Sequence, residues 1–245
     1  SNVAPAANWV FAVKGVGDAK FARPFLEFRS DHGRYVKTYG SAITAPTTVN
    51  NLTNISVNEN DFTGTIIGAT FDSDGYLETD GSSNNITIPG LTLSGSGGFT
   101  VEMWVKLTGL QSDTGWNYFV RDEDGLTPPQ YEIGIFNNDN YTWIFKQNSI
   151  SESVTTVLTQ NQWHHICFGV NASQQLGFIY RDGIYAGGST NSFSTGDIPL
   201  YKMFGDFATS SGIAGQFGEI RGYDRELSGT EVSQNFNATR AKYGV

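Results

Sequence analysis

Acidic side chains occur in this sequence as closely spaced pairs. Paired carboxyl groups are what glycoside hydrolysis requires. That reaction needs two carboxyl groups on either side of the scissile bond, about 5–10 Å apart. Pairs that would share one face of a strand are Asp72/Asp74, Glu78/Asp80 and Asp122/Asp124. All of them lie at glycine-containing turns rather than in the middle of a strand. We therefore expect no catalytic residues and classify the protein as not an enzyme.

Glu219 and Asp224 are a further pair of acidic residues near the C-terminus. They are five positions apart, so on a regular strand they face opposite ways. This spacing also argues against a pair of facing catalytic carboxylates.

Histidine and cysteine are the next candidates for chemistry. His164 and His165 are adjacent, so they project from opposite faces of a strand, and Cys167 shares a face only with His165. A zinc site or a Cys-His nucleophile would need a third partner, and the remaining histidine is His32 in a distant segment. We expect Trp163, His165 and Cys167 to pack together in a core, where a buried cysteine behaves as a small apolar residue.

Aromatic side chains could bind a sugar, because exposed rings stack on sugars while Asn, Asp and backbone groups supply hydrogen bonds. The candidate ligand-binding residues are Trp104, Trp116, Tyr118 and Trp143, with Tyr141 beside them. The alternative is that these rings belong to the core of a β protein, as most aromatic side chains do.

Residues 99–107 contain the pattern around which the chain is organised. One side of this strand carries Phe99, Val101, Met103, Val105 and Leu107, and the other carries Thr100, Glu102, Trp104 and Lys106. Alternation with a period of two predicts a strand with one face on a core.

Further strands are expected along most of the chain. They are predicted at 65–71, 76–79, 85–89, 118–120, 131–136, 141–145, 154–158, 163–170, 176–181, 184–185 and 215–223. Asp182-Gly183 between two β-prone runs predicts a hairpin. Ser228 and Glu231 form a capping box that begins a helix running to about Lys242. The predicted fold class is all-β: a two-sheet antiparallel sandwich, or jelly roll, with one short C-terminal helix.

Composition and charge limit the function classes. The chain has 245 residues, a net charge of −9 and one cysteine. Residues 1–50 carry six Lys/Arg and three Asp/Glu, so the rest of the chain carries nine Lys/Arg and twenty-one Asp/Glu. An acidic body argues against nucleic-acid binding, and a single cysteine excludes an intrachain disulfide. No run reaches the roughly 18 apolar residues of a membrane span, and no signal-peptide pattern is visible.

The first 62 residues differ from the rest. Short apolar bursts alternate there with Gly, Pro and charge, and residues 41–60 are rich in Thr, Asn and Ala. We predict an extended arm or small subdomain at 1–62 and a β-sandwich domain at 63–245.

Several segments in order resemble the concanavalin A-like lectin/glucanase superfamily, in its laminin-G-like or pentraxin-like branch. The segments are Phe71–Asp72, Tyr76–Glu78, Phe99–Lys106, Gln162–Ile166, Tyr180–Gly183, Phe217–Ser228 and Glu231–Phe236. They cover about residues 64–243. The resemblance implies a concanavalin A-like sandwich, and that fold hosts lectins, adhesion modules and hydrolases alike.

Calcium is a cofactor implied by the resemblance, since many relatives hold Ca²⁺ with carboxylates and loop carbonyls. The candidate metal ligands are Asp72 and Asp74, or Asp122 and Asp124, with Glu219 as a further oxygen donor. The alternative is that these acidic turns are simply solvated.

Two hypotheses on function remain open. The first is a non-catalytic structural or adhesion protein on the surface of a virion, such as a bacteriophage capsid decoration or tail-associated protein. It would contact other virion proteins through residues 1–60, act as a homo-oligomer and bind surface glycans. The second is a carbohydrate-binding module of a bacterial surface or polysaccharide-utilisation protein, located outside the cell or on its surface. A β-glucanase-like hydrolase that uses Glu78 or Glu219 is a third and less favoured alternative.

Overall fold

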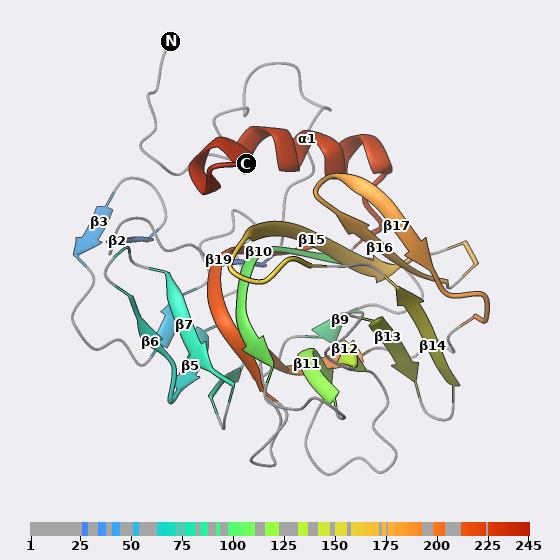
Figure 1. Ribbon diagram of the computed structural model, residues 1–245, viewed down its shortest axis with the longest axis horizontal. Helices are drawn as coiled ribbons and strands as arrows, with labels where there is room; N and C mark the ends of the chain where they lie inside the picture. Colours follow the sequence, from blue (N-terminus) through green and yellow to red (C-terminus); the bar gives the residue numbers. More distant parts are fainter. Residues whose placement is uncertain are drawn as a thin grey trace.

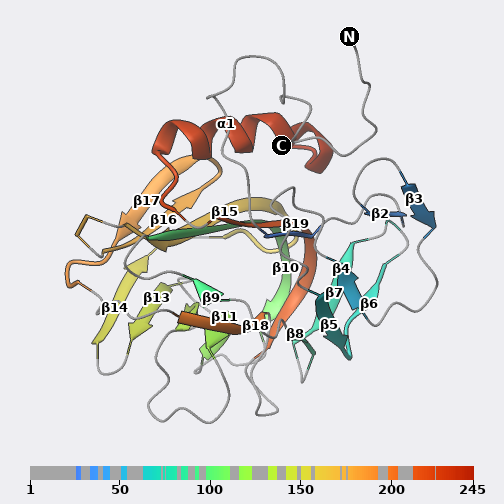
Figure 2. The ribbon, with the colours of Figure 1, turned by 180° about the vertical axis from the view of Figure 1, so that it is seen from behind.

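A computed structural model of the protein contains two antiparallel β-sheets that face each other and one C-terminal helix on the outer side of the first sheet (Figure 1). Seen from behind, the same three layers follow one another: helix, first sheet, second sheet (Figure 2). The structure describes residues 26–28, 34–37, 41–44, 51–53, 63–72, 74, 76–81, 84–87, 92–93, 98–110, 116–122, 132–136, 142–147, 150–155, 158–171, 173–174, 176–192, 198–203, 212–223 and 225–245.

The first sheet has the strand order β17-β16-β15-β10-β19-β7-β6, with β1 also paired to β19. Its strands are β1 (Leu26–Phe28), β6 (Thr70–Phe71), β7 (Leu77–Asp80), β10 (Phe99–Leu110), β15 (Trp163–Val170), β16 (Gly177–Arg181), β17 (Ile184–Gly188) and β19 (Ile213–Tyr223). The central pair is β10 and β19, whose antiparallel register runs from Thr100 opposite Tyr223 to Leu110 opposite Ile213.

The second sheet has the order β14-β13-β12-β11-β18-β8-β5-β4, with β9 beside β18. Its strands are β4 (Asn51–Thr53), β5 (Thr63–Ile67), β8 (Asn85–Thr87), β9 (Thr92–Leu93), β11 (Trp116–Asp122), β12 (Glu132–Phe136), β13 (Thr142–Gln147), β14 (Ile150–Thr155) and β18 (Ile198–Met203). A separate two-stranded sheet pairs β2 (Arg34–Lys37) with β3 (Ser41–Thr44). The predicted antiparallel sandwich is confirmed.

The helix α1 (Gly229–Thr239) begins at the predicted capping box and continues into the 3₁₀ helix η2 (Arg240–Tyr243). The Ser228 Oγ accepts a hydrogen bond from the Glu231 N–H, and the Glu231 carboxylate accepts one from the Ser228 N–H at 2.8 Å. These two bonds satisfy amide groups that a helix start leaves without partners. No helix in the described part of the chain has the length and apolar character needed to cross a membrane.

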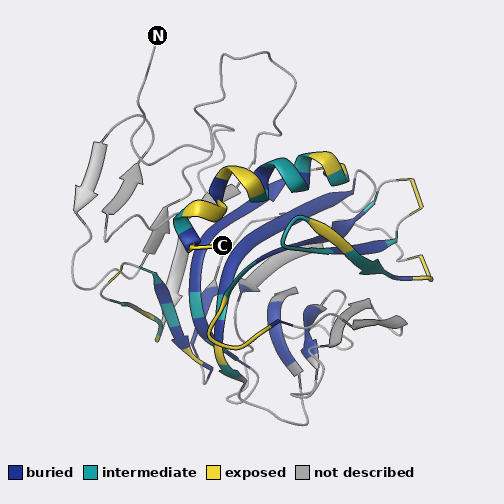
Figure 3. Ribbon diagram, turned by 45° about the horizontal axis from the view of Figure 1, so that its top comes forward, coloured by how far each residue is buried: buried dark blue, intermediate teal, exposed yellow. Residues whose placement is uncertain are grey.

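Strand β10 is buried on both faces, which corrects the expectation of a strand with one face on a core. Its apolar side chains are at most 2% exposed and point toward the second sheet, as alternation requires. The polar side carries Thr100, Glu102 and Trp104, which are also at most 1% exposed. The C-terminal helix covers Glu102 and Trp104, and the segment that precedes it hydrogen-bonds Thr100. Figure 3 shows the strands buried beneath the helix, which is exposed only along its outer side.

The predicted strand at 65–71 is in fact two strands in different sheets. Gly68 has a φ of +73°, a conformation that glycine adopts without steric cost, and it separates β5 in the second sheet from β6 in the first. The Asn84 Nδ2 donates a hydrogen bond to the Gly68 carbonyl at 2.9 Å and holds this crossing in place.

Two short strands from residues 1–62 join the main sheets. β1 pairs with the C-terminal half of β19, and β4 pairs with β5. The division into an arm at 1–62 and a domain at 63–245 stays a prediction, but these pairings connect the two parts. β18 was not predicted from the sequence; Pro199 lies in this strand, paired with Thr92 of the short strand β9.

Candidate functional site

A buried polar cluster lies between the first sheet and the C-terminal helix. Its centre is Arg221 on β19, whose guanidinium donates to Glu102 on β10 at 2.7 Å and to Glu219 on its own strand. All three side chains are at most 2% exposed. The two carboxylates therefore serve as ion-pair partners of a single buried arginine.

The helix completes this cluster. The Glu102 carboxylate also accepts hydrogen bonds from the Tyr223 hydroxyl at 2.8 Å and from the Asn235 amide at 3.1 Å. Lys242 on η2 lies 3.4 Å from Glu219. Burial raises the pKa of Glu102, but neighbouring His165 and the charge of Arg221 outweigh burial and lower the pKa to about 2.

The adjacent histidines face opposite ways, as predicted, and make different contacts. The His164 Nε2 accepts from the Thr159 N–H at 3.0 Å, so its Nδ1 carries the proton and donates to Asp182 at 2.9 Å. His165 is fully buried with its Nε2 3.5 Å from Glu102, and Cys167 beyond it is buried against the helix. Burial raises the pKa of the Cys167 thiol well above its usual value, as expected for a core cysteine.

Trp104 is a core residue and not an exposed platform for a sugar. Its ring is 0% exposed, stacks on Tyr243 at a centroid distance of 4.2 Å, and donates from Nε1 to Thr239 at 2.9 Å. Tyr118 is also buried, at 6% exposure. The structure thus supports the core alternative for both residues and corrects the ligand-binding prediction, because both rings are buried and Trp104 lies under the C-terminal helix.

The other predicted ligand-binding residues are only partly described. Trp116 begins β11 and Trp143 lies in β13, but their side chains fall outside the described residues, as does Tyr141. The structure does not bring these two tryptophans to the buried cluster, because their strands belong to the second sheet.

The predicted calcium ligands do not converge in the described part of the chain. Asp72 closes its own turn by accepting from the N–H groups of Asp74 and Tyr76, and it also accepts from the Gln216 amide at 2.6 Å. Asp122 ends β11, while the Asp122 side chain and Asp124 lie outside the described residues. Among the residues described, no group of three or more His, Cys, Asp or Glu side chains could hold a metal ion.

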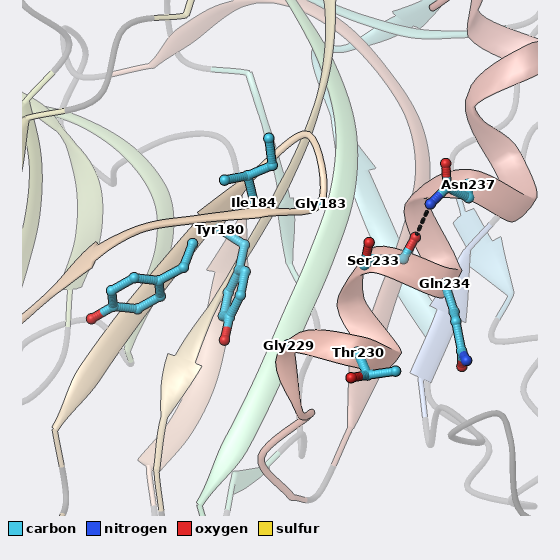
Figure 4. A pocket seen from close by; sticks show the side chains of 9 residues that line it. Tyr180, Gly183, Ile184, Gly229, Thr230, Ser233, Gln234 and Asn237 are labelled. Carbon is cyan, nitrogen blue, oxygen red and sulfur yellow. Dashed lines mark hydrogen bonds between the residues drawn. The ribbon is translucent and has the colours of Figure 1, made fainter.

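A surface groove of about 550 Å³ lies between the hairpin of β16 and β17 and the outer side of α1. We call it the hairpin–helix groove. Its lining residues are Tyr180, Gly183, Ile184, Tyr185, Gly229, Thr230, Ser233, Gln234 and Asn237. Figure 4 shows Gly183 and Ile184 on the hairpin wall, and Thr230, Ser233 and Asn237 on the helix wall.

The hairpin wall holds the largest exposed apolar surface that the structure describes. Ile184 is 72% exposed and Tyr185 is 58% exposed, and the Tyr185 ring packs edge-on against Tyr180 at a centroid distance of 5.3 Å. Among the described residues, Val245 is the other large hydrophobic side chain that is exposed.

Two glycines allow the hairpin and the helix to approach. Asp182 and Gly183 have φ values of +51° and +77°, as the predicted tight hairpin requires, and a Cβ on Gly183 would lie 3.0 Å from Phe236 of α1. A Cβ on Gly229 would lie 3.1 Å from the Tyr180 hydroxyl. The groove is thus built from one hairpin turn and the first two turns of a capped helix.

The groove offers the groups that bind a sugar: a tyrosine face and several hydroxyl and amide side chains. The Asn237 Nδ2 donates to the Ser233 carbonyl at 2.8 Å, which leaves its second N–H and its oxygen for a ligand. Sequence reasoning did not find this site, although Ile184 and Tyr185 directly after Asp182-Gly183 were a signal of exposed apolar residues at a hairpin. The missing information was the helix on the other wall.

Residues 80–233, more than half of the chain, match a laminin G family model described as the concanavalin A-like lectin/glucanases superfamily. The chain belongs to this superfamily. The predicted family is therefore confirmed. No curated protein sequence matches this lectin-like chain.

Solved structures share its fold at low sequence identity. Domain 4 of AbnA, an extracellular arabinanase from Geobacillus stearothermophilus in complex with arabinotriose, is 20% identical with a TM-score of 0.57, over 88% of this chain and 98% of that one. Trypanosoma rangeli sialidase in complex with sialic acid is 15% identical with a TM-score of 0.62, over 87% of this chain. This chain spans about a third of that sialidase, since 33% of it is covered.

The receptor binding domain of botulinum neurotoxin type G is another structural relative. It is 14% identical with a TM-score of 0.59, over 89% of this chain and 52% of that one. The likeness to all three shows that the lectin-like chain shares their β-sandwich fold.

Proposed function

We propose that this protein is a non-catalytic recognition module that binds carbohydrate in the hairpin–helix groove. The observation that carries the proposal is an exposed tyrosine, Tyr185, that lines the same groove as hydroxyl and amide side chains of α1. Sugars bind by stacking their C–H face on an aromatic ring while their hydroxyls bond to polar groups, and the groove supplies both. The structural relative solved with arabinotriose supports the proposal, because it matches over its whole length.

The contacts and burial of two acidic side chains support the proposal that the protein is not catalytic. Glu102 and Glu219 share Arg221 and lie under the helix, so neither faces a groove in which a glycosidic bond could sit. Hydrolysis needs two carboxyl groups that reach the same bond. Incubation with β-glucans should release no reducing ends, and release that disappears in Glu78→Gln would contradict this part.

A glycan array tests the recognition function. The labelled protein should bind a defined set of glycans, and Tyr185→Ala should weaken the binding by about tenfold because the stacking surface is lost. Val245→Ala is the matched control, since Val245 is 45% exposed and does not line the groove. Silence of the unaltered protein across the array would overturn the function.

We also propose the narrower location on a virion surface, as a capsid decoration or tail-associated protein present in many copies. Its support is the single, buried Cys167, which suits a protein that folds in a reducing cytosol and works outside it, and the contrast between the basic front segment and the acidic body. The alternative is a module of a bacterial surface or polysaccharide-utilisation protein.

Particle association separates these locations. The protein should co-purify with intact particles, and removing residues 1–24, which leaves β1 in place, should release it if the front segment makes the contact. A protein that remains free of every particle fraction, and monomeric, would contradict the virion location.

A further inference from the structure

We infer that the hairpin–helix groove takes an electrically neutral saccharide and binds it without a metal ion. The inference rests on the proposed carbohydrate-binding function and specifies the ligand class of that same groove. It follows from the residue types that line the groove, from the pairing of the charged residues beside it, and from the hydrogen bonds at the helix start.

The lining carries no ionisable acid or base apart from tyrosine. Its nine residues are two glycines, two tyrosines, one isoleucine and four hydroxyl or amide residues. An acidic sugar, such as a sialic acid or a uronic acid, is bound by pairing its carboxylate with arginine or lysine. The lining offers no such partner, and a protein of net charge −9 repels an anion on approach.

Two arginines beside the groove are paired with acidic side chains. At the hairpin turn, Arg181 Nε lies 3.6 Å from the Asp182 carboxylate. At the helix start, the Arg225 guanidinium lies 2.5 Å from the Glu231 carboxylate. Both arginines are therefore already engaged, and the negative charge of Glu226, which acts on Tyr180 of the lining, would repel an anion.

The helix start does not attract an anion either. A helix N-terminus favours negative charge through its unpaired N–H groups and its dipole. Here Glu231 supplies that charge from within the chain, accepting from the Ser228 N–H at 2.8 Å and the Ser228 hydroxyl at 2.9 Å. A ligand in the groove therefore faces a helix start that is already compensated.

The residues that line the groove also do not suit a calcium ion. Ca²⁺ takes six to eight oxygen ligands and usually two or more carboxylates, whereas the lining contains no carboxylate. Sugar hydroxyls must then bond directly to Thr230, Ser233 and Asn237. Figure 4 places these three side chains along one side of the groove, opposite Ile184.

Calorimetric titration of the full chain tests the inference with two sets of probes. The neutral set is arabinotriose, cellotriose, diacetylchitobiose and a fucosylated lactose; the charged set is sialyllactose and a digalacturonate. Each titration is run with calcium and with EDTA. We expect binding only in the neutral set, and we expect EDTA to leave it unchanged.

Three variants locate the binding. Tyr185→Ala should weaken it by about tenfold, while Tyr185→Phe, which keeps the ring, should change it by less than about threefold. Val245→Ala, which is exposed but lies outside the groove, should leave the binding unchanged. Unaltered melting temperatures show that these exposed positions do not disturb the fold.

The outcomes separate the two proposals. Binding of the charged set, or loss of binding in EDTA, overturns the inference and leaves carbohydrate recognition standing. Neutral binding that Tyr185→Ala does not weaken overturns the groove as the site. If no glycan of either set or of the array binds, the proposed function itself is wrong.

Discussion

Arg221 is the residue on which the buried cluster depends. It pairs with two glutamates that are at most 2% exposed. Its positive charge offsets the free energy that burying their carboxylates costs. Desolvating an ion costs several kcal/mol, so a buried ion pair adds little net stability when intact, but removing one partner leaves an uncompensated charge. The cluster thus fixes which side chains meet under the helix more than it raises stability.

Arg221→Met should therefore lower the free energy of unfolding by about 3–5 kcal/mol. Arg225→Met is the matched control: Arg225 is 46% exposed and pairs with Glu231, so its loss should cost about 0–1 kcal/mol. Urea denaturation followed by fluorescence measures both. Equal losses in the two variants would show that the buried arginine is not the centre of the cluster.

The stability of the protein at acidic pH should depend on the ionisation of Glu102. The pKa of Glu102 is about 2 in the folded protein, against roughly 4.3 for an unfolded glutamate. A lowered folded pKa means that the unfolded chain takes up the proton first, so this stabilisation is present above pH 4.3 and is lost as the pH falls toward 2.

Unfolding free energies measured at intervals between pH 5 and pH 2 should therefore decrease. The pKa of Glu231 is also about 2, mainly because of its hydrogen bond with Arg225. Glu231→Gln should nevertheless retain most of the decrease, because that pair is exposed to solvent. A profile that is flat in the unaltered protein would contradict the assignment.

The β16–β17 hairpin and α1 are the elements that form the groove, and Gly183 is one of the two glycines that allow their contact. Gly183 has a positive φ and lies directly against Phe236, so both the turn and the close approach need a residue without a Cβ. The hydrogen bonds of Asp182 to His164 and to the His165 N–H tie the same turn to the start of β15. The hairpin is therefore held from two sides.

Gly183→Ala should destabilise the protein and weaken glycan binding, since the new Cβ would lie 3.0 Å from Phe236 and force the two walls apart. Gly244→Ala is the matched control: its φ of +73° carries a similar backbone cost, of roughly 1 kcal/mol, but nothing lies within 4 Å. Thermal unfolding and glycan titration compare the two. Equal effects would show that the Phe236 contact is unimportant.

The molecule as a whole consists of three layers, and the front segment contributes to two of them. β1 pairs with Gly222, Arg221 and Ile220 of β19, opposite the side on which β10 pairs with the same strand. β4 extends the second sheet beside β5. Residues 1–62 therefore include strands that complete the sandwich as well as whatever contacts the segment makes with other proteins.

Truncation tests this contribution. A chain beginning at residue 34 lacks β1, whereas a chain beginning at residue 25 keeps it. The shorter chain should be less stable by roughly 1–3 kcal/mol, because backbone groups of β19 beneath the helix lose their partners. Urea midpoints of the two truncated chains measure the difference. Identical midpoints would mean that the sandwich is complete without β1.

Local signals in the sequence were sufficient for most of the elements. Alternation over Phe99–Leu107 predicted the central strand, Asp182-Gly183 predicted the hairpin, and Ser228 with Glu231 predicted the helix start. Each signal depends on residues within a few positions of one another, where backbone geometry alone sets which side chains share a face. The family resemblance followed from the order of such segments.

Long-range contacts decided what the sequence did not reveal. Glu102 meets Asn235 across 133 positions, so the polar face of β10 was predicted to be a surface and is instead covered by the helix. Trp104 is a core residue for the same reason. The groove likewise depends on α1 lying beside a hairpin almost fifty residues earlier in the chain. Periodicity shows which side chains share a face, and only the folded chain determines what covers that face.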